Sequence, residues 1–398
     1  MIHVSEARPR IAVFTLGYLP SFVGGAEIAI KEISERLAGR FDFDVYAARF
    51  DSSEPAIENF GGARVIRVGW GWPGARPSQA SGLRGFALKV AYPFLAALAA
   101  RRRHRETPYA VLWGVMAAFG GAAARIFLAL TPRAEAHPRF LLTLQEGTPP
   151  EEIAREARFI KPIFASAFRR ASRVQAISRY LADWARSWGA TCPVDVVPNG
   201  ADVAAFSSAR PDPELRARLK VPEGMFLVAT VSRLARKNGV DTLVEAIAQT
   251  ENVALVIFGD GPDRAALEDL VRARELAWRV RFAGEVSPEA LPPLLKACDA
   301  FARLSRSEGF GNAFVEAMAA GIPVVATGVG GILDFARDEE NALVVPPEDP
   351  EAASAAIVRL QHDAALRGKL SLEGVATASR YSWDDVAAKV GDIFRLLV

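Results

Sequence analysis

The stretch SEGFGNAFVEAMAAGIPVVAT, residues 307–327, combines two glutamates with residues that are almost all small or apolar. Gly-Phe-Gly is typical of a turn, Asn312 is a good helix N-cap, and residues 313–320 are predicted to form a helix. Apolar runs precede and end the stretch, which predicts a strand, a helix and a second strand. A carboxylate in apolar surroundings is costly unless something pairs with it, so Glu308 and Glu316 are expected to hold a ligand.

The same alternation extends along the chain. Apolar runs bounded by turn residues predict strands at 11–15, 65–68, 110–113, 140–144 and 195–197, then at 226–231, 254–258, 280–283, 300–304, 323–326 and 342–345. Helical patterns lie between them, such as AEIAIKEISERLAG, which ends near Gly39. This spacing predicts right-handed βαβ units and parallel sheets. The predicted fold class is α/β, with two Rossmann-like domains that face a central cleft and are divided near residues 203–222.

Length and composition agree with this organisation. A chain of 398 residues is long for one core, and 51% apolar with 24% charged residues is typical of globular proteins. The two cysteines, Cys192 and Cys298, are far apart and lack metal-ligand spacing, which argues against a zinc site or a disulfide framework. The start, MIHVSEARPRIAVF, lacks the long apolar core of a cleavable signal, so a cytoplasmic location is expected.

The net charge of +2 conceals an asymmetry between the two halves. Residues 1–200 contain 26 Lys and Arg against 17 Asp and Glu, whereas the remainder contains 22 against 29. A basic first half indicates an anionic partner, such as a phosphorylated acceptor or a membrane surface. Two differently solvated surfaces are the alternative.

Three loops that follow predicted strands of the second half carry candidate chemistry. In SRLARKNG, Arg233 and Lys237 precede a helix that starts near Val240, and two cations beside a helix N-terminus favour a phosphate. In IFGDGP, Gly259 allows a ligand to approach the backbone. In the opening stretch, the two glutamates can accept hydrogen bonds from sugar or ribose hydroxyls. A structural carboxylate that caps backbone is the alternative for either one.

Together these motifs resemble a known family. EGFGNAFVEAMAAGIPVVAT, SRLARKNG and IFGDGP are similar to the donor-binding domain of GT-B fold glycosyltransferases, most of all the large retaining family 4. PSFVGGAEIAIKEISERL resembles the Gly-Gly loop and first helix of that family, and VVPNGADVAAF resembles its interdomain segment. The resemblance spans almost the whole chain. It implies an acceptor-side domain at 1–203 with a crossover helix at about 381–398, and a nucleotide-sugar domain at 204–380.

The resemblance also implies roles for individual residues. Arg233 and Lys237 are expected to neutralise the diphosphate, Glu316 to bind the ribose, and Glu308 to bind the transferred sugar. These two cations, Glu308 and Gln145 are the expected catalytic set. The expected donor-binding set is Gly24, Gly25, Arg233, Lys237, Gly259, Gly284, Glu285, Val286, Glu308, Phe310, Gly311, Asn312, Ala313 and Glu316.

Two positions depart from the family pattern. The family usually has a lysine five residues after the arginine, where this chain has Asn238, with Lys237 one place earlier. It commonly has a histidine after the strand that ends near Leu144, where this chain has Gln145. Glutamine can hydrogen-bond a sugar hydroxyl but cannot titrate, and Glu146 is a candidate to share the role.

The implied activity is the transfer, with retention, of a hexose-type sugar from a UDP- or GDP-sugar to a hydroxyl of a glycan or lipid-linked acceptor, in cell-envelope polysaccharide or glycolipid synthesis. Fixed positive groups would stabilise the leaving diphosphate, and the acceptor proton would pass to the departing phosphate oxygen. The alternative is a catalytically inactive, glycosyltransferase-like binding or partner subunit, motivated by Gln145. A glycoside hydrolase leaves Arg233 and Lys237 unexplained, and no GxGxxG follows the first strand for a dehydrogenase.

No metal and no cofactor besides the nucleotide-sugar are expected. The pair Asp42 and Asp44 in FDFDVY has the spacing of a metal site in the other major glycosyltransferase fold, but it opens a predicted strand without nucleotide context.

The acceptor side is marked by residues 84–105, RGFALKVAYPFLAALAARRRHR, which join an apolar run to a cluster of arginines. The run is short for a membrane span, so it is expected either to lie on a membrane beside anionic lipids or to be a core-facing helix with a solvated basic end. Residues 159–173 add positive charge. Both segments fit a polyprenyl-linked acceptor and a peripheral position on the inner face of the cell membrane. No nucleic-acid partner is expected.

Overall fold

In the computed structural model of this chain, all residues are described except 1–7, 76–81, 133–134, 136 and 157–160. The chain divides into unit 1, which comprises Met1–Asn199 and Trp383–Val398, and unit 2, which comprises Gly200–Ser382. The structural boundary lies at 199/200, where the sequence suggested 203/204. Two stretches discussed above lie outside the described residues. They are residues 1–7 of the N-terminal segment MIHVSEARPRIAVF and residues 159–160 of the basic segment 159–173.

Unit 1 is built on an eight-stranded sheet in the order β3-β4-β2-β1-β5-β6-β7-β8. All neighbouring strands in it are parallel except β3 and β4, which are antiparallel. The strands are β1 (Arg10–Phe14), β2 (Asp42–Ala48), β3 (Ile57–Phe60), β4 (Ala63–Val68), β5 (Val111–Val115), β6 (Arg139–Leu144), β7 (Arg173–Ala176) and β8 (Val194–Val196).

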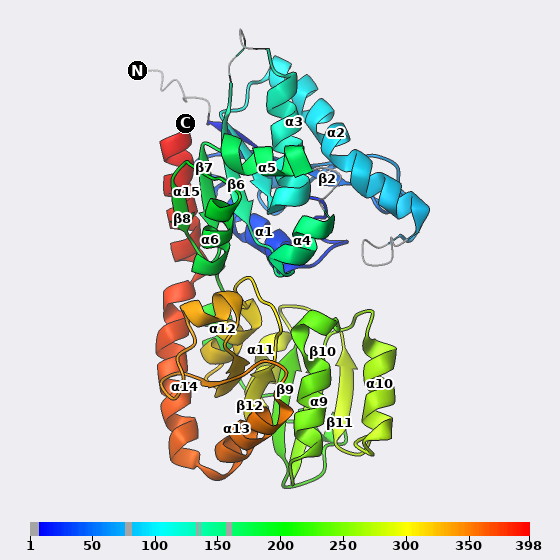
Figure 1. The fold of residues 1–398 in the computed structure, drawn as a ribbon, viewed down its shortest axis with the longest axis vertical. Helices are drawn as coiled ribbons and strands as arrows, with labels where there is room; N and C mark the ends of the chain where they lie inside the picture. Colours follow the sequence, from blue (N-terminus) through cyan, green and yellow to red (C-terminus); the bar gives the residue numbers. More distant parts are fainter. Residues whose placement is uncertain (1–7, 76–81, 133–134, 136, 157–160) are drawn as a thin grey trace. The chain divides into compact units, whose positions relative to one another are not determined.

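Helices surround this sheet (Figure 1). They are α1 (Gly25–Leu37), α2 (Leu83–Glu106), the π-helical turn η1 (Met116–Gly121), α3 (Ala122–Leu130), α4 (Pro150–Glu156), α5 (Lys161–Arg170), α6 (Arg179–Ser187) and α15 (Trp383–Leu397). Sequence reasoning missed β3 and β7. Strand β7 contains a polar residue, Gln175, which is buried because its amide bonds to Thr143 Oγ1 (2.8 Å) and Val197 O (3.1 Å).

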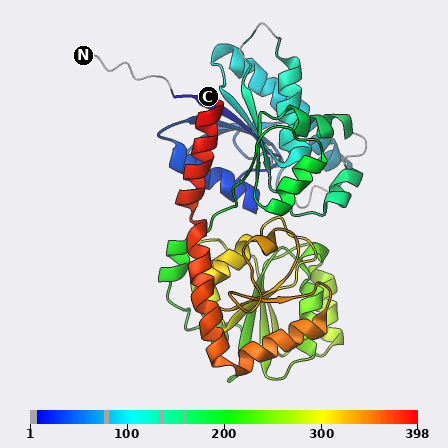
Figure 2. The ribbon, with the colours of Figure 1, turned by 60° about the vertical axis from the view of Figure 1, so that its left-hand side comes forward.

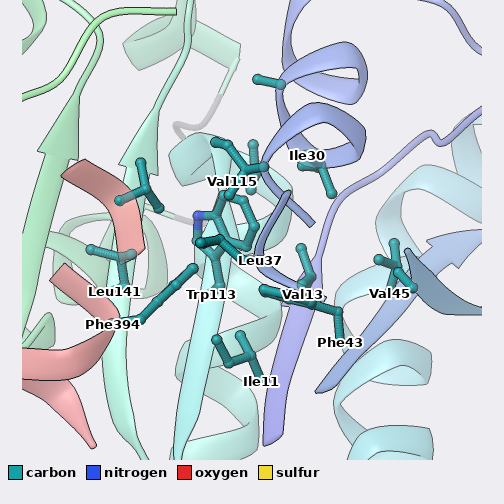
Figure 3. Close-up of a cluster of buried hydrophobic side chains, with 14 of the residues drawn as sticks. Ile11, Val13, Ile30, Leu37, Phe43, Val45, Trp113, Val115, Leu141 and Phe394 are labelled. Atoms are coloured by element: carbon teal, nitrogen blue, oxygen red, sulfur yellow. The ribbon is translucent and has the colours of Figure 1, made fainter. Parts of the chain in front are cut away.

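The core of unit 1 joins both ends of the chain (Figure 3). Apolar side chains of β1 and β5, including Val13 and Trp113, pack with residues of the C-terminal helix α15. The ring of Phe394 lies 5.3 Å from that of Trp113, and Arg36 Nε of α1 lies 2.6 Å from Asp384 Oδ1. Burial of such large aromatic side chains fixes α15 as part of unit 1.

Unit 2 is built on a six-stranded parallel sheet in the order β11-β10-β9-β12-β13-β14. Each of its strands was predicted within one or two residues. They are β9 (Phe226–Val231), β10 (Val253–Phe258), β11 (Val280–Gly284), β12 (Ala300–Arg303), β13 (Val324–Thr327) and β14 (Leu343–Val345).

The helices of unit 2 pack around this sheet, with α14 beside α12 (Figure 2). They are α7 (Val203–Ser208), α8 (Leu215–Arg218), η3 (Arg236–Asn238), α9 (Val240–Ala248), α10 (Arg264–Ala273), α11 (Leu291–Lys296), α12 (Asn312–Ala319), η4 (Gly330–Asp334), α13 (Pro350–His362), α14 (Ala364–Ala378) and η5 (Ser379–Tyr381).

The start of α12 corrects one prediction. Its N-cap is Gly311, and Asn312 is the first residue inside the helix. Gly311 has φ 101°, which side chains rarely adopt, and a Cβ there would lie 2.6 Å from the ring of Phe314. The sharp turn after the buried Phe310 therefore requires glycine at the cap position, which excludes asparagine from it.

The strand orders locate the sites. In unit 1 the chain order reverses between β1 and β5, and in unit 2 it reverses between β9 and β12. Ligands of open parallel sheets bind beyond the carboxyl ends of the strands at such points.

Candidate functional site

The loop after β9 carries the predicted phosphate ligands. Arg233 is exposed and Lys237 is half-buried in the turn η3, directly before α9 begins at Val240. Between them and α9, Gly239 has φ 65°, and a Cβ at this residue would lie 1.7 Å from Leu304 O. Glycine is therefore needed for the loop to pass against the end of β12.

Asn238, at the position where the resembled family usually has a lysine, has a structural role. Asn238 is buried; its Nδ2 donates to Arg233 O at 2.6 Å, and its Oδ1 accepts from Arg303 Nη2 at 2.6 Å. Asn238 therefore shapes the loop that presents Arg233 and connects it to β12. A buried amide with both ends bonded is a rigid link.

Arg303 is the residue that sequence reasoning missed. It ends β12, and the same Nη2 also donates to Glu308 Oε2 at 2.6 Å, in an ion pair whose side chains are 11% and 12% exposed. Its guanidinium lies 5.6 Å from the centre of the Phe314 ring. The available signal was a lone cation near the carboxyl end of the otherwise apolar run AFARL. Because this run was predicted to be a strand, Arg303 was not considered as a site residue.

Both glutamates of the opening stretch are affected by this guanidinium, Glu308 through a hydrogen-bonded ion pair and Glu316 through its charge. Burial raises the pKa of Glu316 to about 7, and the charge of Arg303 opposes this rise. Glu308 is already paired with Arg303. The structure thus brings both carboxyl groups and the phosphate loop to one cation at the switch point between β9 and β12.

A second arginine, Arg306, is hydrogen-bonded to the same loop. Arg306 N donates to Lys237 O at 2.7 Å, and the Arg306 guanidinium makes two bonds of 2.7 and 2.9 Å to Asp241 and one of 2.8 Å to Glu348. Because these bonds satisfy its guanidinium with carboxylates of the unit itself, we regard Arg306 as structural.

The other predicted donor contacts differ in accessibility. The side chain of Phe310 is buried against the rings of Phe335 (5.2 Å) and Tyr381 (5.4 Å), so its expected ligand contact can come only from the backbone. Asn312 is half-buried and Ala313 is buried at the start of α12. Around β10 and β11, Gly259 N donates to Gly284 O at 2.7 Å. In the next loop Glu285 is exposed and Val286 is half-buried.

Several polar atoms at the same strand ends are buried without a hydrogen-bond partner among the described residues. They are Thr230 Oγ1, Ser232 Oγ, Arg303 Nε and Ser305 Oγ. Unpaired buried groups are uncommon and are often matched by water or ligand. Their position at the ends of β9 and β12 agrees with a polar ligand there.

The predicted Gly-Gly loop lies in unit 1. Gly24 is the N-cap of α1 and Gly25 is its first residue; no side chain caps this helix start within the described chain. In the first turn, burial raises the pKa of Glu27 to about 8. Glu27 is therefore mostly neutral at pH 7 and does not repel an anion at the helix N-terminus.

Gln145 and Glu146 follow β6 in unit 1 and are both buried. Gln145 Oε1 accepts from Asn199 Nδ2 at 3.0 Å, so Gln145 lies in an amide network of unit 1. The pair Asp42 and Asp44 does open β2, and Asp44 is bound by Arg10, Arg103 (2.8 Å) and Tyr109 (2.5 Å). No group of three or more potential metal ligands occurs among the residues that the structure describes.

Comparison with family models covers most of the chain. Residues 23–205 match the model of Glycosyltransferase Family 4, and residues 211–374 match that of Glycosyl transferases group 1. The chain belongs to the family 4 (group 1) glycosyltransferases. The family recognised from the Gly-Phe-Gly and SRLARKNG motifs is thereby confirmed.

Solved structures of similar architecture confirm the GT-B fold class. Sucrose-phosphate synthase from Thermosynechococcus elongatus is 24% identical, with a TM-score of 0.81 over 98% of this chain and 99% of that one. HepE from Anabaena in complex with UDP and glucose is 20% identical, with a TM-score of 0.77 over 98% of this chain and 100% of that one.

Curated relatives are more similar over shorter regions. The GDP-mannose-dependent alpha-(1-6)-phosphatidylinositol monomannoside mannosyltransferase of Mycobacterium tuberculosis is 32% identical over 59% of this chain and 65% of the relative. The D-inositol 3-phosphate glycosyltransferase of Salinispora tropica is 33% identical over 55% of this chain and 48% of the relative. The lipopolysaccharide core biosynthesis glycosyltransferase LpsD of Rhizobium meliloti is 36% identical over 48% of this chain and 56% of the relative. The chain thus spans about half to two thirds of the length of the relatives it matches.

Proposed function

We propose that this protein is a retaining, metal-independent glycosyltransferase. It transfers a hexose-type sugar from a UDP- or GDP-sugar to a hydroxyl of a glycan or lipid-linked acceptor, in cell-envelope polysaccharide or glycolipid synthesis. The observation that carries the proposal is the network at the switch point of unit 2, in which Arg303 is paired with Glu308 and is joined through Asn238 to the backbone of the loop that carries Arg233.

The network suits a nucleotide-sugar because such a donor has both phosphates and hydroxyls. Arg233 and Lys237, beside the N-terminus of α9, supply fixed positive groups for the charge that develops on the leaving diphosphate. Glu316 and Glu308 accept hydrogen bonds from ribose and sugar hydroxyls. The acceptor proton passes to the departing phosphate oxygen as the new C–O bond forms.

The names of similar proteins support the substrate classes. One relative is named for GDP-mannose and phosphatidylinositol monomannoside, another for lipopolysaccharide core biosynthesis, and HepE was solved with UDP and glucose. These classes combine a nucleotide-sugar donor with envelope glycans or lipids.

A membrane position is supported by α2. The sequence suggested that the apolar run of this helix is short for a membrane span, but the helix extends over Leu83–Glu106 and, among the described helices, it alone is long and apolar enough to cross a bilayer. Its inner face packs in unit 1 against α3 and β2. Its outer face has a stripe of exposed apolar residues, 50% to 86% exposed: Leu83, Phe86, Val90, Phe94 and Leu98. Exposed Arg84, Arg102 and Arg105 flank this stripe. A helix packed on one face, with an apolar stripe beside cations, suits the interface of an anionic membrane.

The donor site is tested by thermal unfolding of the protein with UDP, GDP, ADP and their sugar conjugates, without added metal. A nucleotide at about one hundred times its Kd adds roughly 2.7 kcal/mol of stability, and one base should give a clear shift. Turnover of that labelled donor with a lipid-extract acceptor then tests transfer. Binding without turnover would favour the inactive partner subunit, and no binding would contradict the proposal.

The membrane contact is tested by sedimentation with phosphatidylglycerol vesicles. The double variant F86D/F94D should lose vesicle binding and retain nucleotide binding, because both rings project from unit 1. Leu372→Asp, which changes an equally exposed apolar residue of α14, is the control and should sediment as the wild type does. Sedimentation of F86D/F94D equal to wild type would contradict the contact.

A further inference from the structure

The guanidinium of Arg303 is largely buried at the end of β12 but is only partly bonded. Its side chain is 11% exposed, and a single atom, Nη2, makes the 2.6 Å bonds to Asn238 Oδ1 and Glu308 Oε2. Nε is buried and has no hydrogen-bond partner among the described residues. Because a guanidinium also donates through Nε and Nη1, these two bonds leave part of a buried cation for a further partner.

The phosphate loop, which follows β9, lies against this end of β12. Asn238 connects the guanidinium to the loop backbone, because its Nδ2 donates to Arg233 O at 2.6 Å. One residue further along each segment, a Cβ at Gly239 would lie 1.7 Å from Leu304 O. Two consecutive residues of β12 and its continuation therefore touch the loop, and Arg303 is a cation of the corner in which that loop leads into α9.

The ligand group that suits this corner is an anionic oxygen. Helix α9 begins at Val240, and no side chain caps its first turn within the described chain. The free N–H groups and the dipole of a helix N-terminus favour negative charge, and a guanidinium beside them binds phosphate oxygens strongly. A neutral hydroxyl would use neither the charge of Arg303 nor the dipole of α9.

The neighbouring carboxylate indicates which phosphate is bound. Glu308 is expected to bind hydroxyls of the transferred sugar, and its Oε2 lies 2.6 Å from Arg303 Nη2. A group beside the sugar meets the phosphate that is bonded to the sugar before it meets the phosphate on the nucleoside side. We propose that Arg303 binds the phosphate to which the transferred sugar is attached. This inference rests on the proposed function and adds to it a donor-binding residue outside the loop motifs.

Such a contact acts on the chemical step. When the bond between the sugar carbon and the phosphate oxygen breaks, its electron pair stays on that oxygen, and the phosphate gains negative charge. A fixed guanidinium stabilises this charge more strongly in the transition state than in the bound donor. Because Arg303 is held by Asn238 and Glu308 before the donor arrives, little reorganisation is needed.

The same geometry gives a reason for the asparagine at position 238, where the resemblance leads us to expect a lysine. Asn238 Oδ1 lies 2.6 Å from Arg303 Nη2, so a lysine at position 238 would bring a second cation close to the guanidinium. Like charges in such a partly buried place repel each other. Asn238, which offers an oxygen, is compatible with Arg303, and the cation of this pair stands at position 303.

The contact is tested with nucleotides that differ by one phosphate. Arg303→Met removes the guanidinium, and Arg303→Gln removes its charge but keeps an amide that can bond to Glu308; the second variant serves if the first does not fold. Both should bind the free nucleoside diphosphate about tenfold or more weakly, because a charge-assisted bond is lost. Affinity for the nucleoside monophosphate, which lacks this phosphate, should be nearly unchanged. Isothermal titration measures both.

A rescue variant and a control accompany this measurement. Arg303→Lys restores a cation and should recover most of the lost affinity for the diphosphate. Arg306→Met is the control: Arg306 lies three residues further along, and its guanidinium is bonded to Asp241 and Glu348. It should bind both nucleotides as the wild type does.

Two results would overturn the inference. Equal weakening of diphosphate and monophosphate binding in the Arg303 variants would show a purely structural role, and unchanged binding of both would show no role. Failure of the proposed function would be distinct, because the wild type would then bind no nucleotide. In that case pyrophosphate, which has neither base nor sugar, is titrated. Binding that Arg303→Gln abolishes would support the phosphate contact, and no binding by the wild type would overturn it.

Discussion

At the carboxyl end of the unit 2 sheet, Arg303 is bonded to Asn238 and Glu308, whereas at the carboxyl end of the unit 1 sheet Gln145 and Glu146 carry buried atoms with no partner in the described structure. The first site is charged, and its cation Arg303 is bonded to an amide and a carboxylate of the same unit, although Arg303 Nε and neighbouring hydroxyls have no partner among the described residues. The second is uncharged below about pH 7 and incomplete.

The difference matches the ligand groups that the sequence leads us to expect at each site. Phosphates require positive groups held in place before the ligand arrives, and a buried charge is held in place by pairing and hydrogen bonding. A sugar hydroxyl requires a donor and an acceptor that are not already occupied. Each buried group left unpaired costs about 1–3 kcal/mol, which a bound ligand can offset.

The largest effect is expected from removing charge at the unit 2 site. Arg233→Ala should lower turnover by two or more powers of ten, equivalent to about 3–4 kcal/mol, because a preorganised positive group for the leaving diphosphate is lost. Steady-state kinetics with the identified donor measures it. Arg236→Ala, in the same loop with an exposed side chain, should stay within a few fold of wild type. Equal losses in both variants would remove the special role of Arg233.

Breaking the internal bonding of the unit 2 site should have the next largest effect. Arg303→Met leaves Glu308 and Asn238 unpaired and should cost about 3 kcal/mol of unfolding free energy. The charge of Arg303 lowers the pKa of Glu316, so removal of Arg303 should raise this pKa above about 7. We expect activity to rise with pH as Glu316 ionises, and in the variant this rise should move to higher pH.

The matched control separates stability from chemistry. Arg306→Met also breaks ion pairs, with Asp241 and Glu348, and should lower stability without moving the pH profile. Chemical unfolding and pH–rate profiles of both variants test this. An unmoved profile in Arg303→Met would show that Glu316 does not carry the titration.

The unit 1 site should make the stability of the protein depend on pH. Glu146 has its pKa raised by burial from 4.5 to about 7, so unfolding releases a proton from it and stability falls as pH rises between these values. Wild type should therefore lose roughly 2–3 kcal/mol between pH 5 and pH 8 relative to Glu146→Gln. Thermal unfolding of both proteins across this range checks it. Parallel stability curves would mean that Glu146 ionises normally in the fold.

The smallest effect tests the turn that positions Glu308 and Glu316. Asn312→Ala should change stability by only a few tenths of a kcal/mol, because Gly311 and not Asn312 occupies the cap position. Gly311→Ala should cost more than about 1 kcal/mol, because its φ of 101° is unfavourable for any side chain. Equal losses would place the cap at Asn312.

Much of the fold could be read from local patterns. Each strand of unit 2 is a mainly apolar run bounded by turn residues, and all six were predicted. Strand β3 (IENF) was missed because half of its residues are polar and none is buried, and β7 was missed because it buries Gln175, whose amide is satisfied only by neighbours distant in sequence.

The residues of the candidate site likewise divide into those that local patterns revealed and those that they did not. Arg233, Lys237, Glu308 and Glu316 were found because they follow strands in recognisable motifs. Arg303 was hidden inside a strand, and its role depends on partners five residues ahead and 65 residues behind. Phe310 was assigned to the ligand because the pattern did not show that its ring packs on Phe335 and Tyr381.

The sequence by itself therefore determined the family, the strand–helix order and the loops that carry the chemistry, because these depend on short-range patterns of burial and turn geometry. The tertiary structure alone decided which polar groups satisfy one another. It pairs Arg303 with Glu308 and Asn238, and it leaves Gln145 Nε2 and Glu146 Oε2 unpaired within the described chain. A hydrogen bond between distant residues depends on sheet order and register, which no local pattern contains.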